Sequence, residues 1–419
     1  MRSFAQLDEA ILANQERSFA FLERLVAASS TVGNEGAALD TFAEQMTELG
    51  FATTDLPFHP GLADDPIAGA VQVVSGPRRN TLARKGTNRS PSLLLHGHID
   101  VVPAEWPHLW ASPPFEPSRR DGWLYGRGAG DMKCGFAMGA LALMALHEVD
   151  PDFPNGQLSF LAAVEEECTG NGTLSACRQG VLADAVIALE PTGLDLMVGG
   201  IGILWCDVTV EGHPTHAHTA HESANAFTML QRLADALHEW GGRLNAEFPD
   251  PVLEGVDSPY NINVGQISGG DWPSSGPASA TMRVRVGYPR EWTPVRAESE
   301  VRGLLASTAS ALGLPRDPGV VLSGFRAKGY WLSPKHPLAV ALSAAHVDAH
   351  GVEPRAYSLG STTDARFYVN DFHTPAICFG PTVRNIHGLD ESVELDSITR
   401  GARTLARFLN AWFSDRSES

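Results

Sequence analysis

The sequence is poor in cysteine, in positive charge and in long apolar runs. Its 5 cysteines among 419 residues are scattered, without the close pairs of a thiolate zinc site or a disulfide framework, and we interpret them as reduced thiols. Lysine and arginine number 31 against 49 aspartates and glutamates, a net charge of −18. Binding to nucleic acid uses clustered cations to displace counterions, so we expect no nucleic-acid partner.

Apolar segments of two kinds are also missing. No window approaches the roughly 18 apolar residues of a membrane span, so we expect no membrane partner. The first twelve residues contain Asp8 and Glu9 and no apolar core of signal-peptide length, which predicts a cytoplasmic protein. Hydrophobic residues nevertheless make up 43% of the sequence, which is enough for a globular chain of about two domains.

Apolar residues recur at helical spacing over residues 4–28 and 37–49, which predicts a pair of helices at the start of the chain. After a stretch rich in proline and glycine, short apolar runs alternate with helical patterns. The runs lie at 93–95, 158–164 and 185–189, and the helical patterns at 133–148 and 175–180. This alternation predicts a largely parallel sheet flanked by helices.

The pattern changes after Gly199-Gly200 and then returns. A strand at 203–210, a helix at 224–240, strands at 260–267 and 280–286 and a helix at 295–312 predict an inserted α+β domain. A helix at 337–350, a strand at 374–379 and a helix at 395–413 follow. We therefore predict an α/β fold, with a catalytic domain formed by residues 1–200 and 317–419 around a mostly parallel central sheet, and an inserted domain at 201–316.

Histidines and acids follow several of the predicted strands. His96-Gly97-His98-Ile99-Asp100 follows the first run, Glu165-Glu166-Glu167 the second and Glu190 the third, while His387 lies in the loop after 374–379. A further acid, Asp131, ends a glycine-rich turn before a predicted helix. The carboxyl ends of parallel strands meet at one edge of a sheet, so we expect these side chains to converge there. Imidazole and carboxylate ligands without thiolates suit zinc, cobalt or manganese.

Two of these segments predict finer chemistry. Residues i and i+2 of a strand share a face, so the carboxylate of Asp100 can receive the ring N–H of a metal-bound His98, although His-X-Asp also occurs by chance. The three consecutive glutamates are alternatively a solvated charge run. Because they end an apolar strand, we expect one to bind metal while its neighbour faces a water molecule as general base.

The order of these residues resembles that of one enzyme family. The chain is similar to the dinuclear metallopeptidases and deacylases grouped with acetylornithine deacetylase, succinyl-diaminopimelate desuccinylase, aminoacylase and glutamate carboxypeptidase. The matching segments are ordered, correctly spaced and spread over nearly the whole chain. They are His96 to Pro103, Gly126 to Gly135, Glu165-Glu166-Glu167, Glu190-Pro191-Thr192, Gly212 to Ala217, Asp364-Ala365-Arg366, and His387 with Asp390-Glu391.

The resemblance implies two divalent metal ions per chain, bridged by Asp131. His98 and Glu190 would complete one metal site, and Glu167 and His387 the other. Zinc is the favoured metal, and cobalt or manganese would fit the same ligands.

The resemblance also implies catalytic and substrate-binding roles. Glu166 would be the general base for a metal-bridging water that attacks the carbonyl of a small N-acyl amino acid-like substrate, with Asp100 supporting His98. The inserted domain would serve as a lid and join two chains into a homodimer, in which His216 reaches the partner's site and helps to hold the oxyanion. Arg366 would bind a substrate carboxylate, with a structural ion pair as the alternative.

Departures from the family pattern fall in the inserted domain. The family has an Asn before Val-Pro or Ile-Pro and an Arg further along, whereas this chain has the segment Asp271 to Pro277 and then Gly287 at the position of the arginine. Arg283 and Arg285 lie nearby in a different register. Because those family residues help to recognise the substrate, these departures leave the substrate class open.

Several alternatives remain open at this point. The histidines at 213, 216, 218 and 221 form a second possible metal site, or else a polar loop.

Two other enzyme classes are disfavoured. The turn at 126–130 lacks the spacing of a dinucleotide-binding fingerprint, and the sequence has no Gly-X-Ser-X-Gly elbow of the kind that indicates a serine hydrolase. Besides an N-acyl amino acid deacylase, a dipeptidase or carboxypeptidase, a hydrolytic deaminase of a non-amide carbon–nitrogen bond, and a non-catalytic metal-binding homologue are possible.

Overall fold

The larger sheet of the protein has a parallel centre. The structure, a computed structural model, describes residues 4–73 and 76–414. Strands β6 (Gln157–Ala163), β3 (Ser92–His98), β7 (Val186–Ala188) and β15 (Ala376–Cys378) lie side by side and parallel. The alternation of apolar runs and helices thus forms the parallel arrangement that the sequence predicts.

The edges of this sheet are mostly antiparallel. On one side β2 (Arg79–Gly86) pairs with β6, and β1 (Ala52–Pro57) pairs with β2. On the other side β8 (Leu196–Gly200) pairs antiparallel with β15 and with β13 (Tyr330–Trp331), whereas β14 (Ala356–Leu359) runs parallel to β8. The parallel strands are therefore buried in the middle of the sheet.

Helices cover both faces of the larger sheet. One face carries α1 (Phe4–Ala27), α2 (Gly36–Glu48), α3 (Lys133–Val149), α7 (Pro337–His350) and α9 (Leu395–Ser414), and the other carries α4 (Asn171–Arg178) and α8 (Ala365–Asn370). Successive side chains of a strand point to opposite faces. Accordingly Leu93 and Leu95 join the core beneath the first group of helices, while Leu94 packs in the core on the other face.

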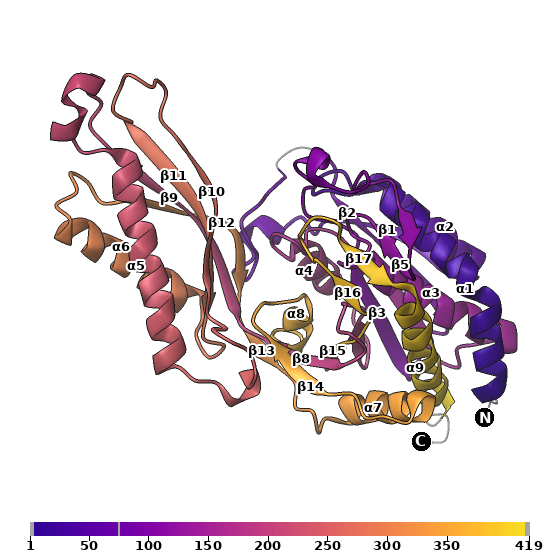
Figure 1. The fold of residues 1–419 in the computed structure, drawn as a ribbon. Coiled ribbons are helices and arrows are strands. Elements are labelled where there is room, and N and C mark those ends of the chain that lie inside the picture. Colours follow the sequence, from indigo (N-terminus) through magenta and orange to yellow (C-terminus); the bar gives the residue numbers. More distant parts are fainter. Residues whose placement is uncertain (1–3, 74–75, 415–419) are drawn as a thin grey trace.

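A second sheet forms a lobe beside this body (Figure 1). It consists of β10 (Ile262–Gly269), β11 (Ser279–Tyr288), β9 (Gly202–Glu211) and β12 (Gly319–Ala327), all antiparallel in that order. Helices α5 (Ala226–Glu247) and α6 (Pro294–Ala311) pack on one face and share a separate apolar core with it. The opposite face is not covered by these helices.

Small elements complete the fold. A third sheet joins β4 (Ser118–Arg120), β5 (Trp123–Tyr125), β16 (Val383–Arg384) and β17 (Ser392–Glu394). Short 3-10 helices lie at Leu62–Asp64, Pro107–Leu109, Ala217–Glu222 and Pro251–Leu253. Within the described ranges, each helix is too short or too polar to cross a membrane.

Two predicted boundaries change. Strand β3 extends to His98, beyond the predicted end at residue 95, so both of its histidines belong to the strand. Strand β12 pairs with β9 in the second sheet, although the inserted domain was expected to end at residue 316. We therefore propose that the inserted domain covers residues 201–327, because β12 contributes Phe325 and Ala327 to its core.

Candidate active site

The five residues predicted to bind metal lie at the carboxyl edge of the parallel strands. His98 is the last residue of β3, Glu167 follows β6 and Glu190 follows β7. Asp131 precedes α3, and His387 lies between β16 and β17. Distant parts of the sequence meet here because parallel strands direct their ends to the same edge of the sheet.

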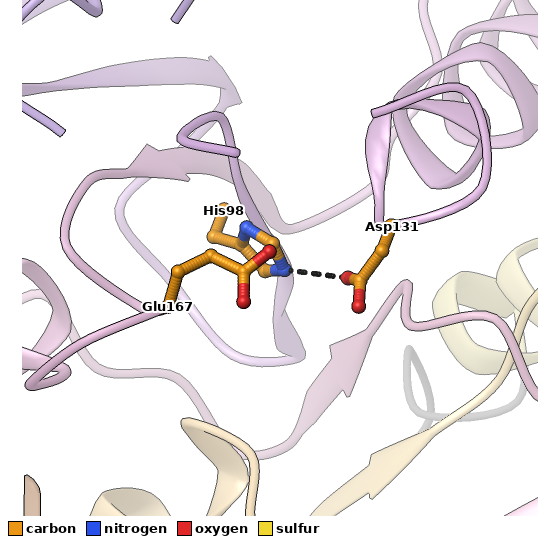
Figure 2. A group of neighbouring side chains, drawn as sticks. All are labelled: His98, Asp131 and Glu167. Atoms are coloured by element: carbon orange, nitrogen blue, oxygen red, sulfur yellow. Dashed lines mark hydrogen bonds and ion pairs between the residues drawn. The ribbon is translucent and has the colours of Figure 1, made fainter. Parts of the chain in front are cut away.

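Asp131 lies between two imidazole rings. Its Oδ1 is 3.0 Å from Nε2 of His98, and its Oδ2 is 3.4 Å from Nε2 of His387. Nε2 of His387 is also 3.0 Å from Oε2 of Glu167. Figure 2 shows His98, Asp131 and Glu167 pointing into one space, where one ligand atom of each lies within 4.8 Å of the others. A carboxylate placed in this way can bridge two cations that each have an imidazole ligand.

Two contacts fix the main chain that bears Asp131. The carboxylate of Glu391 accepts the N–H of Asp131 at 2.9 Å and that of the preceding residue at 2.8 Å, and also pairs with Arg127. Helix α3 passes so close to the residue after β7 that a Cβ at Gly135 would lie 2.0 Å from the carbonyl oxygen of Leu189. The sequence alone assigned no role to Glu391.

The group of acids fits divalent cations. Oε1 of Glu167 and Oε1 of Glu190 are buried and have no hydrogen-bond partner within the described part of the chain. The pKa of Glu190 is raised to about 8, first by burial and then by the negative charge of Asp131, against the opposing charge of His98. Carboxylates crowded in this way repel one another unless cations lie among them. Together with two imidazoles and no thiolate, they form a donor set suited to zinc, cobalt or manganese.

The pKa values of the two histidines also indicate a site that favours positive charge. Burial alone would lower the pKa of His98, but the hydrogen bond to Asp131 and the charges of Glu190 and Glu166 raise it well above 6.5. Burial also opposes protonation of His387, yet the charges of Glu167 and Asp131 raise its pKa to about 11. The carboxylates around both rings thus favour positive charge at this place.

Asp100 supports the site differently from the prediction. Nδ1 of His98 lies 3.0 Å from the main-chain carbonyl oxygen of Asp100 and 3.7 Å from its carboxylate, so the carbonyl rather than the carboxylate is the hydrogen-bond partner. The carboxylate instead accepts the main-chain N–H groups of Glu166 and Glu167, each at 3.2 Å. It thereby ties the end of β3 to the turn that bears both glutamates.

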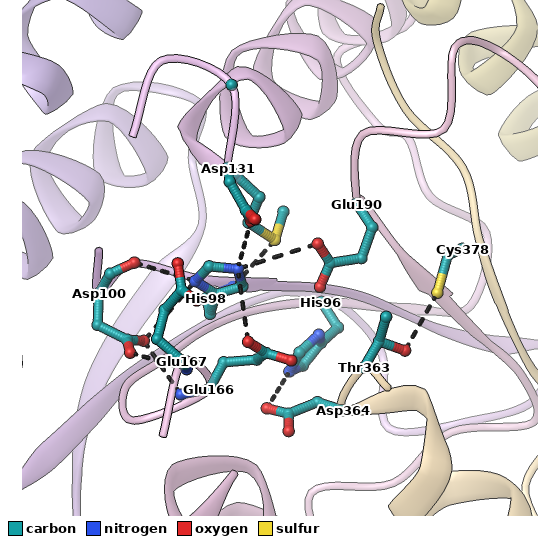
Figure 3. Close-up of polar contacts among 12 residues, drawn as sticks. His96, His98, Asp100, Asp131, Glu166, Glu167, Glu190, Thr363, Asp364 and Cys378 are labelled. Atoms are coloured by element: carbon teal, nitrogen blue, oxygen red, sulfur yellow. Dashed lines mark hydrogen bonds and ion pairs between the residues drawn. The ribbon is translucent and has the colours of Figure 1, made fainter. Parts of the chain in front are cut away.

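Glu166 lies next to the predicted metal ligands. Its Oε2 is 3.9 Å from Nε2 of His98, the same distance as Oε2 of Glu190. Figure 3 shows Glu166 and Asp131 approaching the ring of His98 from different sides. Burial raises the pKa of Glu166 well above its usual range, and the nearby Asp364 and Glu190 raise it further against the charge of His98.

The first glutamate of the triplet has a structural role. Glu165 adopts a positive φ of 64° and accepts a hydrogen bond from Nε of Arg78 at 3.0 Å. The guanidinium of Arg78 also pairs with Glu35 at 2.6 and 2.8 Å, and all three side chains are buried or nearly so. This network holds the turn in a conformation that non-glycine residues rarely adopt.

His216 lies on the second lobe, in the loop after β9. It is exposed, and its Nδ1 accepts the main-chain N–H of His218 at 3.1 Å. Its described contacts are with that loop and with Ser275, not with the group around Asp131. The described loop residues do not bring three ligand atoms of the histidine cluster together as a second metal group.

Arg366 does not face the candidate site. It is 2% exposed, and its guanidinium donates to the carbonyl oxygens of Thr363 and Thr169 at 3.1 and 2.8 Å. It also pairs with Asp364 at 3.2 Å. These contacts favour the structural ion pair over the predicted binding of a substrate carboxylate, because they involve the buried guanidinium.

Two neighbouring cavities border the carboxylates. One of about 470 Å³ is lined by Asp131, Glu166 and Glu190, and another of about 780 Å³ by residues near Val102. Glu167 and His387 line both, and the facing walls come from the second sheet. One of the facing residues is Arg285, which the sequence had placed only near the expected arginine position.

Comparisons with known proteins agree with this arrangement. The model of peptidase family M20/M25/M40 matches residues 94–411. A succinyl-diaminopimelate desuccinylase from Methylorubrum populi is 32% identical over 416 residues, which cover 96% of this chain and 100% of that protein. One from Methylobacterium radiotolerans is 32% identical over 403 residues, covering 93% and 95%.

Solved structures share the fold at lower sequence identity. The di-peptidase Dug1p from Saccharomyces cerevisiae has a TM-score of 0.81 and 15% identity, with 99% of each chain covered. Human carnosine dipeptidase 1 has a TM-score of 0.79 and 16% identity, with 98% of this chain and 99% of that chain covered. Both alignments include the two-lobed architecture of Figure 1 over nearly the full chain.

Proposed function

Because the chain belongs to peptidase family M20/M25/M40 and is a metal-dependent hydrolase of carbon–nitrogen bonds, we propose that it cleaves the amide bond of a small N-acyl amino acid-like substrate. The observation that carries this proposal is the position of Asp131 between His98 and His387, with Glu166 alongside. A bridging acid, two imidazoles and an uncommitted glutamate are the parts that two-metal hydrolysis requires.

The proposed metal ligands divide into two sets that share Asp131. His98 and Glu190 would hold one ion, and Glu167 and His387 the other, with zinc as the first candidate. When bound, such ions polarise the carbonyl and lower the pKa of water. The buried and unpartnered oxygens of Glu167 and Glu190 support this assignment, because each retains an oxygen free to coordinate a metal.

Glu166 would move the proton. Its carboxylate would accept a proton from the attacking water and deliver it to the leaving nitrogen, the ordinary role of a positioned general base. Asp100 would hold it in place by accepting the N–H groups of Glu166 and Glu167. Asp100 is in this account a positioning residue.

His216 would act across a homodimer. It is exposed on the inserted domain and has no described contact with the site of its own chain. A second chain packed against the inserted domain would let His216 donate to the oxyanion formed in the partner's site. Light scattering tests the dimer, and a monomer in active solutions would refute this role.

The relatives of higher identity support one substrate class over the others. Two proteins that match more than nine-tenths of this chain are named as desuccinylases, which favours removal of an acyl group from an amino acid. The dipeptidases are related at 15% and 16% identity, a level that supports the fold alone. We therefore propose a deacylase before a dipeptidase, a deaminase or a non-catalytic homologue.

The test compares the wild type with Glu166→Gln after zinc, cobalt or manganese has been supplied. Amine release is followed on N-acyl amino acids and on dipeptides, ammonia release on amidines, and metal content by mass spectrometry. We expect hydrolysis of N-acyl amino acids by the wild type, and unchanged metal content with activity reduced roughly 100-fold or more in the variant. Glu239→Gln, on an exposed face of α5, is the control. Failure of the metal-loaded wild type to hydrolyse any N-acyl amino acid would overturn the proposal.

A further inference from the structure

Helix α9 carries three arginines at the junction with two other helices, α1 and α7 (Figure 1). Arg400, Arg403 and Arg407 follow one another at intervals of three and four residues, which places them along one side of the helix. Nε2 of His350, on α7, lies 3.1 Å from the carbonyl oxygen of Arg400. Arg407 pairs with Asp8, on α1, at 2.9 Å. A row of cations thus lies where the three helices meet.

This cluster contains more positive than negative charge. Among the described residues, Asp8 is the acid that pairs with the arginines, and Arg400 has no acidic partner. Oδ2 of Asp8 is 2.9 Å from Nη2 of Arg407, but its Oδ1 is 3.8 Å from Nε of Arg403, which is too far for a hydrogen bond. Three guanidinium groups therefore share one carboxylate, in a chain whose net charge is −18.

The histidines of α7 lie within reach of the same charges. Burial lowers the pKa of His350, and the charges of all three arginines lower it further, against the hydrogen bond to the carbonyl oxygen of Arg400. The ring of His346 is 4.7 Å away, and the acid that acts on it is Asp195. Asp195 already pairs with Arg355 at 3.3 Å. The excess of positive charge therefore extends to the end of α7.

Several donors of the cluster also lack acceptors. Nε of Arg403, and both Nε and Nη1 of Arg407, are buried and have no hydrogen-bond partner within residues 4–73 and 76–414. Buried polar groups without partners are rare in folded proteins, and a bound ion is one of the causes. A buried charge that is not compensated is costly. An anion beside the cluster would supply the missing negative charge.

The open side of the cluster is formed by Arg400 and Arg403. Arg407 is 6% exposed, and the ring of Phe4 lies over its guanidinium with the centroid 5.0 Å away. Arg400 and Arg403 are partly exposed, and 28% of the side chain of Arg403 is accessible. Residues three apart on a helix have Cβ atoms about 5–6 Å apart, so both guanidinium groups can reach one anion. Arg407 adds its charge from behind them.

We propose that Arg400 and Arg403 bind a phosphate group at the junction of α1, α7 and α9. Planar guanidinium groups donate parallel N–H groups to phosphate oxygens. Three guanidinium groups and one carboxylate leave two positive charges, and a phosphate group carries a charge of about −1.5 to −2 at pH 7. Inorganic phosphate and the phosphate group of a small ester share this chemistry.

The proposed site is separate from the one around Asp131. Arg400 and Arg403 are not among the described residues that line the two cavities there. The inference therefore goes beyond the proposed hydrolysis and does not depend on it. A bound phosphate would join the first and last helices of the described chain to α7, and so would stabilise the fold.

The test measures how phosphate changes the melting temperature of the zinc-loaded full-length protein. A ligand that binds the folded state raises this temperature with its concentration. Sodium phosphate is compared with sodium chloride at equal ionic strength, because salt screens the arginines. Phosphate also stabilises proteins by exclusion from their surface, and it can bind at the zinc ions. Both contributions are shared by all variants, so differences between variants measure the site on α9.

Three variants separate binding from folding. Arg400→Gln removes a guanidinium without an acidic partner, so the variant should fold. Asp8→Asn removes the carboxylate that competes with the anion. Arg243→Gln, at an exposed position of α5, is the matched control. Calorimetry measures the affinity of each for phosphate, and glycerol 2-phosphate in its place shows whether the preferred ligand is the free anion or an ester.

We expect Arg400→Gln to weaken phosphate binding roughly 10-fold and to reduce the gain in melting temperature. Arg243→Gln should behave as the wild type does. Asp8→Asn should bind phosphate roughly 5-fold more tightly, because a negative charge near the anion is removed. The same variant should be less stable without phosphate, since it loses the pair with Arg407. An ion pair with a structural role alone would not produce tighter binding.

Three results would overturn the inference. Equal gains in melting temperature for the wild type and Arg400→Gln would show an adventitious ion only. A smaller gain in Arg243→Gln, to the level of Arg400→Gln, would show that phosphate responds to net charge and not to a site. Weaker or unchanged phosphate binding by Asp8→Asn would assign the cluster to the packing of the three helices alone.

Discussion

The carboxylate of Glu391 accepts the main-chain N–H of Asp131 at 2.9 Å, so a residue from the C-terminal part of the chain fixes the acid at the centre of the candidate site. A partner of this kind orients a ligand before the metal binds. Loss of such a partner usually costs metal affinity, because the ligand must then be ordered during binding.

We therefore expect Glu391→Gln to lower zinc affinity roughly 10- to 100-fold. The amide retains the size of the side chain but weakens the hydrogen bonds accepted from Asp131 and the pair with Arg127. Competition with a chromophoric chelator measures the affinity. Glu394→Gln, at the end of strand β17, which begins directly after Glu391, is the control. Equal affinities of Glu391→Gln and the wild type would show that the contact does not organise the site.

Asp100→Asn should separate metal binding from catalysis. The two N–H groups of Glu166 and Glu167 donate to different oxygens of Asp100, and in asparagine one of these oxygens is replaced by an NH2 group, which cannot accept a hydrogen bond. We expect kcat to fall about 10-fold or more, as it does when a catalytic group is misplaced, while both metal ions are retained. Parallel measurement of kcat and metal content checks this. A variant that loses metal in proportion to activity would assign Asp100 to the metal ligands instead.

Arg78→Ala should destabilise the protein by about 3–5 kcal/mol, because it leaves the buried carboxylates of Glu35 and Glu165 unpaired. Its neighbour Arg79 pairs with Asp40 and Asp55, whose side chains are 65% and 54% exposed. Arg79→Ala should therefore cost about 1 kcal/mol or less. Urea unfolding of metal-free protein measures both. Similar losses of stability for the two variants would show that the pairing of Arg78 with Glu35 and Glu165 does not stabilise the turn at Glu165.

His346 should make the fold sensitive to acid. Burial, followed by the charges of His350 and Arg400 and against that of Asp195, lowers the pKa of His346 to about 4, whereas an unfolded histidine titrates near 6.5. Between these values the unfolded chain binds a proton that the folded chain does not. Stability should thus fall as the pH drops from 6.5 to 4, with a total loss of about 3 kcal/mol.

His346→Gln should remove this part of the pH dependence, since glutamine does not titrate. The free energy of unfolding of metal-free protein, measured at several pH values in the window from 4 to 6.5, tests it. His238→Gln, on an exposed face of α5, should keep the slope of the wild type. If the stability of His346→Gln has the same pH dependence as that of the wild type, the argument that burial lowers the pKa of His346 is refuted.

Some features of the site could be predicted from the sequence because they depend on strand direction alone. Apolar runs followed by His98, Glu167 and Glu190 specify a parallel sheet with its ligands at one edge, and the structure brings these side chains together. The role of each as a metal ligand remains a prediction. The end of a strand could not be predicted from its apolar run, since β3 continues past that run as far as His98.

Other features depend on pairings between distant segments. Arg366 is buried because its guanidinium meets Thr169, which lies far away in the sequence. Arg285 faces the cavities because the register with β9 and β10 places it beside Trp205 and Asn263. Local spacing does not specify such contacts. The same holds for His98, whose nearer acceptor at Asp100 is the carbonyl and not the carboxylate.

The most direct test of the central claim is the number of zinc ions bound per chain, measured by equilibrium dialysis and mass spectrometry on the wild type and on Asp131→Ala. If Asp131 bridges two ions, the wild type should bind two per chain, and the variant should lose tight binding at both sites although His98, Glu190, Glu167 and His387 all remain. A wild type that binds no zinc, or a variant that still binds two ions with unchanged affinity, would contradict the account.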